Sequence, residues 1–212
     1  VRAHGADTSS LSTIVTGGAG VPSSIVTEAA DMGWAVLRTY GSSEHPTVSA
    51  CAPSDPLERR VHTDGRTLGA NRVRVVDEVG NDVAPGVAGE LVTIGPELFM
   101  GYRDPLHNEG AFLPGGWFRT GDIATVDDEG LITITDRKKD VIIRGGENIS
   151  SMAVEDALSL HPDIADAAVV GAPDPRYGER VCAFVVPRPG ASVSLDDLRR
   201  HFHGVGMAPM KA

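Results

Sequence analysis

Cysteines and long apolar runs are scarce in this sequence, and each shortage excludes a class of protein. Only two of the 212 residues are cysteines, Cys51 and Cys182, and they lie far apart. Two distant thiols make neither a disulfide framework nor a cysteine metal site, so we expect a cytoplasmic location. No apolar run approaches the length that spans a bilayer, so no transmembrane segment is predicted.

Positive charge is also in short supply. Lysine and arginine number 19 against 29 acidic residues, which gives a formal charge of −10. A nucleic-acid-binding protein carries a basic face, so no nucleic-acid partner is predicted, and the acidic excess serves solubility. With 41% hydrophobic and 23% charged residues the chain has the composition of a globular protein, long enough for one large or two small domains.

Residues 1–66 predict a partial α/β sheet unit. A short strand runs into the glycine turn Gly17–Gly20. A helix is predicted from about Ser23 to Met32, with serine hydroxyls as N-caps, and a second strand from Ala35 to Thr39. Ligands of such units bind beyond the carboxyl ends of the strands, where both glycine turns of this segment fall.

The second of these turns, Tyr40 to Glu44, carries groups suited to a nucleotide. Tyr40 offers a flat face for a purine, Ser43 a hydroxyl, and Glu44 an oxygen for the hard cation Mg²⁺. Taken alone, such a turn is more often only a turn. Residues 45–66 are polar and contain proline, which predicts a surface connection with His45 and His62 in solvent.

Residues 67–135 are rich in strands. Alternating apolar positions predict a strand at 72–77. A further strand is predicted at 89–94, and two more at 123–126 and 131–134, joined by a hairpin turn. We expect a small, twisted antiparallel subdomain resembling a barrel, in which Phe99 to Tyr102 serve packing. Asp122 precedes one strand, where its carboxylate either accepts hydrogen bonds from vicinal hydroxyls such as those of a ribose, or caps a turn.

The charged bridge Asp136–Asp140 separates two apolar strands. It is too polar for a core, so it is either a solvated loop or a hinge between domains. A strand, the flexible loop Arg144–Asn148, a helix from Ser151, two strands and a helix that starts with a capping box at Ser194 follow. This order predicts a small α+β lid domain over residues 141–212.

Five motifs, in this order and spacing, closely resemble those of the adenylate-forming superfamily, the AMP-binding enzymes, and especially its acyl-CoA synthetases. They are Gly17-Gly18-Ala19, Tyr40-Gly41-Ser42-Ser43-Glu44, Trp117 to Asp122, Asp136 to Asp140, and Arg144 to Asn148. Gly20 and Ser43 depart from the pattern, which usually has Pro and Thr there. The resemblance implies that residues 1–66 end a large adenylation domain, 67–135 form its β-rich subdomain, 136–140 are the hinge and 141–212 a truncated lid.

The resemblance implies nucleotide-binding roles near the first two motifs. Gly17, Gly18 and Ala19 would form the turn beside the acyl and adenine pocket. Tyr40, followed by Gly41, would stack near adenine. Ser43 would contact phosphate, and Glu44 would act catalytically by helping to bind Mg²⁺.

Roles are likewise implied for the later motifs. Asp122 would bind the ribose, and Arg137 would also reach the nucleotide. Lys139 would be the catalytic hinge residue about which the lid rotates between the half-reactions. The loop that would enter the site for the second half-reaction contains Gly145, Gly146 and Glu147.

The implied reaction has two steps. A carboxylate attacks the α-phosphate of ATP to give acyl-AMP and pyrophosphate, and the thiolate of coenzyme A then displaces AMP. The substrates would be ATP, coenzyme A and a carboxylic acid, for which we expect a medium- or long-chain fatty acid or an alicyclic acid. The protein would mainly position groups and neutralise phosphate charge.

Two family features fall outside this sequence. The phosphate-binding loop belongs upstream of Gly17, and the catalytic lysine belongs beyond the segment Met207–Lys211, so Lys211 is not given its role. We therefore expect a fragment of a longer enzyme that is inactive alone and self-associates through exposed surfaces. The alternatives are an adenylating enzyme that loads a carrier protein and a non-catalytic nucleotide- or acyl-binding module.

Overall fold

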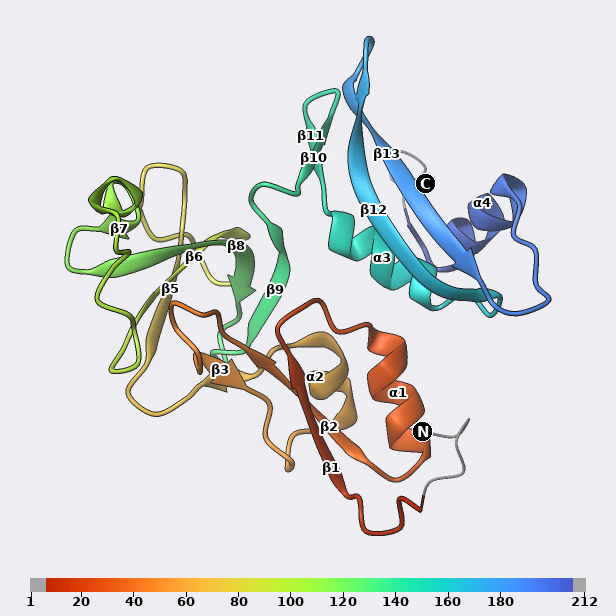
Figure 1. Cartoon of the computed structure of the whole chain (residues 1–212), viewed down its shortest axis with the longest axis horizontal. Helices are drawn as coiled ribbons and strands as arrows, with labels where there is room; N and C mark the ends of the chain where they lie inside the picture. The colour runs from red at the N-terminus through yellow and green to blue at the C-terminus, as the bar shows by residue number, and fades with distance from the viewer. Residues whose placement is uncertain (1–6, 208–212) are drawn as a thin grey trace.

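The computed structural model describes residues 7–207, in which three β-sheets follow one another along the chain (Figure 1). We call them the first, middle and last sheets. Of the segment Met207–Lys211, everything after Met207 lies outside the described residues. No helix among residues 7–207 is long and apolar enough to cross a bilayer.

The first sheet has the strand order β1-β2-β3-β4. Its elements are β1 (Thr13–Gly17), α1 (Ser23–Asp31), β2 (Ala35–Tyr40), β3 (Ser49–Ala50), α2 (Leu57–His62) and β4 (Arg66–Thr67). Strands β1 and β2 are parallel, with Gly17 opposite Thr39, so the turns that follow them lie at one sheet edge. Helix α1 covers the sheet because Val26 and Ala29 on its buried face pack in one cluster with Trp34, which follows the helix, and Val36 of β2. A fully buried valine contributes about 1.5–3 kcal/mol.

The middle sheet is antiparallel and curled. It contains β5 (Arg72–Val76), β6 (Gly89–Ile94), β7 (Phe112–Leu113), β8 (Trp117–Val126) and β9 (Ile132–Arg137), with the short 3₁₀ helix η2 (Pro105–Asn108). Its order is β5-β6-β8-β7, and β9 pairs with β8. Register shifts beside Glu90 and Ile123 mark bulges, which bend and twist a strand. Leu91 and Ile132 fill its core.

The last sheet has the order β11-β10-β13-β12. Its elements are β10 (Ile142–Arg144), β11 (Glu147–Ile149), α3 (Ser151–Ser159), β12 (Ile164–Asp174), β13 (Gly178–Pro187) and α4 (Leu195–Gly204). Its core contains Leu158 and Phe202, one from each helix. The predicted capping box at Ser194 is confirmed, with Asp197 as its reciprocal partner. The three sheets and few helices confirm the predicted combination of α/β and α+β classes.

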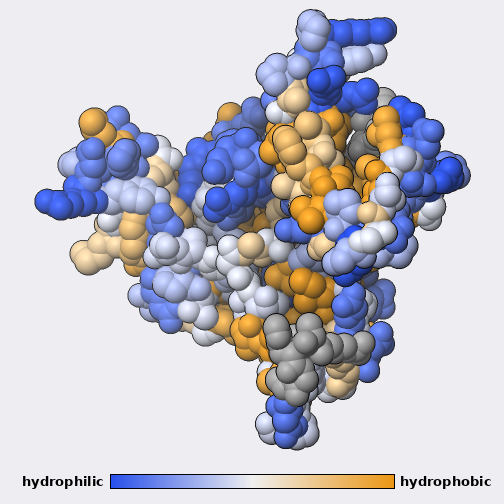
Figure 2. Space-filling model, turned by 45° about the vertical axis from the view of Figure 1, so that its right-hand side comes forward, coloured by the Kyte–Doolittle hydropathy of each residue, from blue (hydrophilic) through white to orange (hydrophobic). Residues whose placement is uncertain are grey.

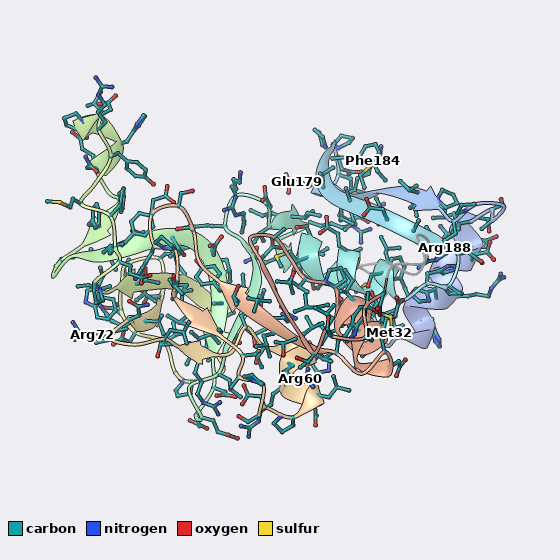
Figure 3. All side chains as sticks on the ribbon, turned by 60° about the horizontal axis from the view of Figure 1, so that its bottom comes forward. Met32, Arg60, Arg72, Glu179, Phe184 and Arg188 are labelled. Atoms are coloured by element: carbon teal, nitrogen blue, oxygen red, sulfur yellow. The ribbon has the colours of Figure 1, made fainter. Side chains whose placement is uncertain are left out.

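The face of β12 and β13 that lies away from this core is apolar and exposed. Val170, Phe184 and Val186 are 47%, 63% and 55% exposed. Figure 2 shows hydrophobic residues in orange on the upper part of the molecule, where the last sheet lies. Phe184 and Glu179 are labelled on this sheet in Figure 3, far from Arg72 of the middle sheet.

Helix α3 docks the last sheet on the other two. At one contact the backbone N–H and hydroxyl of Ser23 donate to Asp156 at 2.8 and 2.9 Å. At the helix start the N–H of Ser151 donates to Asp136 at 2.8 Å, where the helix dipole favours a carboxylate. The predicted serine caps of α1 are wrong, because its N-cap is Pro22 without a side-chain bond. The Ser23 hydroxyl instead joins two sheets.

His45 is buried, which corrects the prediction that it faces solvent; His62 is exposed as predicted. His45 Nδ1 lies 2.9 Å from Thr93 Oγ1, and His45 Nε2 lies 3.1 Å from Asn71 Oδ1. The Asn71 amide nitrogen donates to Thr47 O, so the amide oxygen faces the ring. An amide oxygen only accepts, so Nε2–H of His45 is the donor in this contact. Thr93 belongs to β6 of the middle sheet, and Asn71 lies directly before β5.

Candidate functional site

A cleft of about 1180 Å³ lies where the three sheets meet. Parts of β2, β8, β9, α3 and β12 line it, together with the turns after β1 and β2. The predicted site residues that line it are Gly18, Ala19, Tyr40, Gly41, Ser43, Glu44, Asp122, Arg137 and Lys139. Segments more than a hundred residues apart in the sequence therefore contribute to one hollow.

Asp122 is a nearly buried acid in the cleft. It lies within β8, opposite Arg137 of β9, rather than in a turn before the strand. The Tyr40 hydroxyl donates to its Oδ2 at 2.6 Å, and Arg137 Nε donates to its Oδ1 at 3.1 Å. Asp122 is only 5% exposed, so β2, β8 and β9 together fix a nearly buried carboxylate.

Tyr40 remains a hydrogen-bond donor in this arrangement. Burial, followed by the neighbouring Asp122 charge, raises the pKa of Tyr40 far above its ordinary value. A carboxylate offers about four lone-pair positions, and Tyr40 and Arg137 occupy two on Asp122. The carboxylate therefore retains the capacity to accept from two hydroxyls, which is the chemistry expected for a ribose.

The turn after β2 is held so that Glu44 faces the cleft. Gly41 is required there, since a Cβ atom would lie 2.0 Å from the carbonyl oxygen of Pro46. The Tyr102 hydroxyl donates to Glu44 Oε1 at 2.9 Å, and Phe99 N–H donates to the Glu44 carbonyl at 2.8 Å. Burial raises the pKa of Glu44, but the bond from Tyr102 and further donors bring that pKa below its ordinary value. Glu44 is therefore an anion at neutral pH.

The donor set suits Mg²⁺ that arrives with a nucleotide. Among residues 7–207 no cluster of three or more histidine, cysteine or acidic side chains is arranged to hold a metal ion. Mg²⁺ commonly binds through one or two carboxylates plus substrate phosphates and water. The single carboxylate of Glu44 fits that mode, and the structure offers no self-sufficient metal cage over the part of the chain it describes.

The charged bridge is anchored on one side of Lys139. Lys138 donates from its backbone to Gly121 O at 2.8 Å, and its Nζ lies 3.2 Å from Glu90 Oε2. Arg119 holds the same Glu90 oxygen at 2.6 Å. Lys139, the next residue in the chain, is exposed and lines the cleft. Within residues 7–207 its side chain forms no ion pair or hydrogen bond.

The bridge is less exposed than its composition predicts. Asp136 is 2% exposed and, with Arg137, belongs to β9. The interpretation of the whole bridge as too polar for a core is therefore wrong for Asp136. Its carboxylate is buried because Ser151 and the Arg137 N–H supply hydrogen bonds.

Four predicted site residues do not line the cleft: Gly17, Gly145, Gly146 and Glu147. Gly17 ends β1 inside the parallel pairing. Gly145 and Gly146 form the turn of the β10–β11 hairpin, with φ of +60° and +87°, and Glu147 is the first residue of β11. The predicted flexible loop is thus a two-residue turn between paired strands, and these positive φ values suit glycine.

Sequence analysis missed a buried ion pair at the floor of the cleft. Arg38 and Asp64 are 3.0 Å apart and nearly buried, and both line the cleft. Asp64 Oδ2 also accepts from the N–H of Ile134 in β9, so the pair ties the first sheet to the middle one. An arginine inside the apolar strand 35–40 was the available signal.

Two family models match the chain. The AMP-binding enzyme model matches residues 2–103, and the AMP-binding enzyme C-terminal domain model matches residues 153–209. The chain belongs to the AMP-binding enzymes, the adenylate-forming superfamily that its motifs predict. Arg137, Lys139 and the β10–β11 hairpin lie between the two matched segments.

Individual relatives agree with this membership. The medium-chain fatty-acid–CoA ligase of Escherichia coli (strain K12) is 42% identical over 208 residues, which cover 97% of this chain and 37% of that protein. The amide bond synthetase McbA from Marinactinospora thermotolerans has a TM-score of 0.84 at 39% identity, over 93% of this chain and 40% of McbA.

A further solved structure contains a bound nucleotide. The o-succinylbenzoate coenzyme A synthetase (MenE) of Bacillus subtilis, in complex with ATP and magnesium ion, has a TM-score of 0.84 at 30% identity. The match covers 97% of this chain and 42% of MenE. The chain thus spans about two fifths of the length of the proteins it resembles.

Proposed function

We propose that this chain is part of an AMP-forming acid–CoA ligase, and that its cleft holds the nucleotide. The observation that supports this most directly is the buried Asp122, which is fixed by Tyr40 and Arg137 and retains acceptor positions for two hydroxyls. Glu44 lines the same cleft and offers the carboxylate for Mg²⁺. Such prearranged groups favour positioning and charge stabilisation over covalent catalysis.

In the first half-reaction a carboxylate oxygen of the acid attacks the α-phosphorus of ATP. The bond from that phosphorus to the bridging oxygen breaks, and pyrophosphate leaves with the electron pair. Asp122 would hold the ribose, Arg137 would face the nucleotide, and Ser43 would donate to phosphate. Mg²⁺, when bound, would neutralise phosphate charge, with Glu44 as the residue that helps to hold it.

In the second half-reaction the thiolate of coenzyme A attacks the acyl carbon, and AMP leaves. The β10–β11 hairpin would serve this step after the last sheet has turned about Lys139. Lys138 is anchored to the middle sheet through Glu90, which supports a pivot directly after it. The rotation would break the contacts of Ser23 with Asp156 and of Asp136 with Ser151.

The proposed domain arrangement follows from this mechanism. Residues 1–66 and 67–135 would belong to one adenylation domain, 136–140 would be the hinge, and 141–212 would belong to the lid. The shares of 37–42% that the chain covers in its relatives support a piece of a longer enzyme. The cytoplasmic location and self-association through exposed surfaces remain predictions.

We propose a fatty acid as the carboxylic substrate, a proposal that rests on the similarity to the fatty-acid–CoA ligase. The second candidate is an adenylating enzyme with another acceptor, since McbA is an amide bond synthetase; a carrier protein is the acceptor that the motifs leave open. A non-catalytic nucleotide- or acyl-binding module is the third.

The deciding experiment is ATP–pyrophosphate exchange by the complete protein with a panel of carboxylic acids, followed by addition of coenzyme A. We expect exchange with fatty acids and acyl-CoA after the addition. Exchange without acyl-CoA would favour the other acceptors. The binding-module hypothesis would be favoured over the enzyme hypothesis by two results together: no exchange with any acid, and tight ATP binding by the 212-residue chain in calorimetry.

A further inference from the structure

The Glu44 turn is clamped by a segment that the motifs leave aside. The sequence predicts that residues 99–102 only pack against their neighbours. Phe99 does so: its ring centroid lies 4.8 to 5.7 Å from the ring centroids of Tyr102, Phe112 and Phe118. The same segment also reaches the cleft. Phe99 N–H holds the Glu44 carbonyl, and the Tyr102 hydroxyl holds its carboxylate.

Tyr102 is itself fixed by Asn108. The Tyr102 N–H donates to Asn108 Oδ1 at 2.7 Å, and Asn108 Nδ2 donates to Tyr102 O at 2.9 Å. Its ring is set edge-on against Phe99. The hydroxyl therefore meets Glu44 from a rigid base, whereas Met100, two residues before it, is fully exposed.

We propose that Tyr102 is a positioning residue for the metal–nucleotide complex: its hydroxyl occupies one oxygen of Glu44 and thereby presents the other oxygen to Mg²⁺. A glutamate side chain at the surface otherwise samples many rotamers, and ordering it at each binding event costs conformational entropy. Hydrogen bonds from neighbours to ligating carboxylates orient them, and loss of such a partner typically weakens metal affinity about 10- to 100-fold. This inference rests on the proposed role of Glu44.

The test is Mn²⁺ binding to the complete protein in the presence of ATP without an acid substrate, measured by electron paramagnetic resonance of the free ion. Tyr102→Phe keeps the ring and removes only the hydroxyl, and we expect Mn²⁺ affinity to fall about tenfold. Raising the Mg²⁺ concentration should then restore the exchange rate of this variant to that of the wild type, as a positioning role predicts.

Three further variants make each outcome decisive. Glu44→Gln should weaken Mn²⁺ at least as much as Tyr102→Phe, and Asn108→Ala should weaken it less. Phe112→Leu, which alters the aromatic cluster without touching Glu44, should leave it unchanged. If Glu44→Gln weakens Mn²⁺ but Tyr102→Phe does not, or if Phe112→Leu weakens it equally, the inference is overturned while the proposed function stands. If Glu44→Gln binds Mn²⁺ like the wild type, the proposed metal role of Glu44 fails.

Discussion

The fold holds two parts of the proposed site differently: Asp122 with its partners Tyr40 and Arg137, and the tip of the β10–β11 hairpin. Asp122 is buried, and strands β2, β8 and β9 restrain it through short hydrogen bonds. Gly145 and Gly146 are exposed on a two-residue turn, and Glu147 is exposed at the start of β11; none of the three lines the cleft. A preformed site costs little reorganisation when its ligand binds. In the proposed mechanism the hairpin enters the site only after the last sheet has moved, so the two groups would serve successive steps.

The largest effect is expected from removal of the fixed acid. Asp122→Ala should lower ATP–pyrophosphate exchange by the complete protein about 100-fold or more. It removes bonds to a charged group worth about 1.5–3 kcal/mol each and leaves Tyr40 and Arg137 without their partner. Asp128→Ala in the exposed β8–β9 turn is the control. Unchanged exchange in Asp122→Ala would remove this residue from the nucleotide site.

A proline at the proposed pivot should affect the two half-reactions differently. Lys139→Pro fixes φ near −65° and should spare pyrophosphate exchange while slowing thioester formation at least about tenfold, or 1.4 kcal/mol. Asp128→Pro introduces proline into a turn whose second position favours it, and should slow neither step. Equal loss of both steps in Lys139→Pro would argue against Lys139 as the hinge.

The hairpin tip should matter for one step only. Gly146→Val strains a residue at φ +87°, at a cost of about 1–3 kcal/mol, and should impair thioester formation but not exchange. Gly130→Val is a matched control, since Gly130 has φ +77° in the β8–β9 turn and, like Gly146, open space beside it. Single-turnover transfer from preformed acyl-AMP to coenzyme A gives the measurement; a transfer rate as low in Gly130→Val would show general destabilisation instead.

The smallest effect is expected at the docking contact of α3. Ser23→Ala removes the hydroxyl bonds to Asp156 and leaves the backbone bond. One net hydrogen bond is worth about 0.5–1.5 kcal/mol, so the ratio of thioester formation to exchange should rise by about two- to tenfold. Ser9→Ala, in an exposed turn, should leave the ratio unchanged. A ratio that does not move in Ser23→Ala would mean that this contact does not restrain the last sheet.

The residue pattern predicts much of the local structure. The structure places β5 and β6 within one residue of the bounds predicted for them. Ser194 and Asp197 form the predicted capping box, because both partners lie within one helical turn. The spacing of the motifs likewise indicates the family, which the two family models bear out.

Tertiary structure decides the contacts between distant segments. Tyr40 meets Asp122 across 82 positions of sequence, and Tyr102 meets Glu44 across 58. His45 is buried because Thr93 and an asparagine of another segment satisfy its ring nitrogens. The polarity of a side chain predicts exposure only where no partner exists, and partners are set by strand order and register. The sequence by itself therefore determines the elements and the family, while the folded sheets decide which polar side chains are buried, paired and aimed into the cleft.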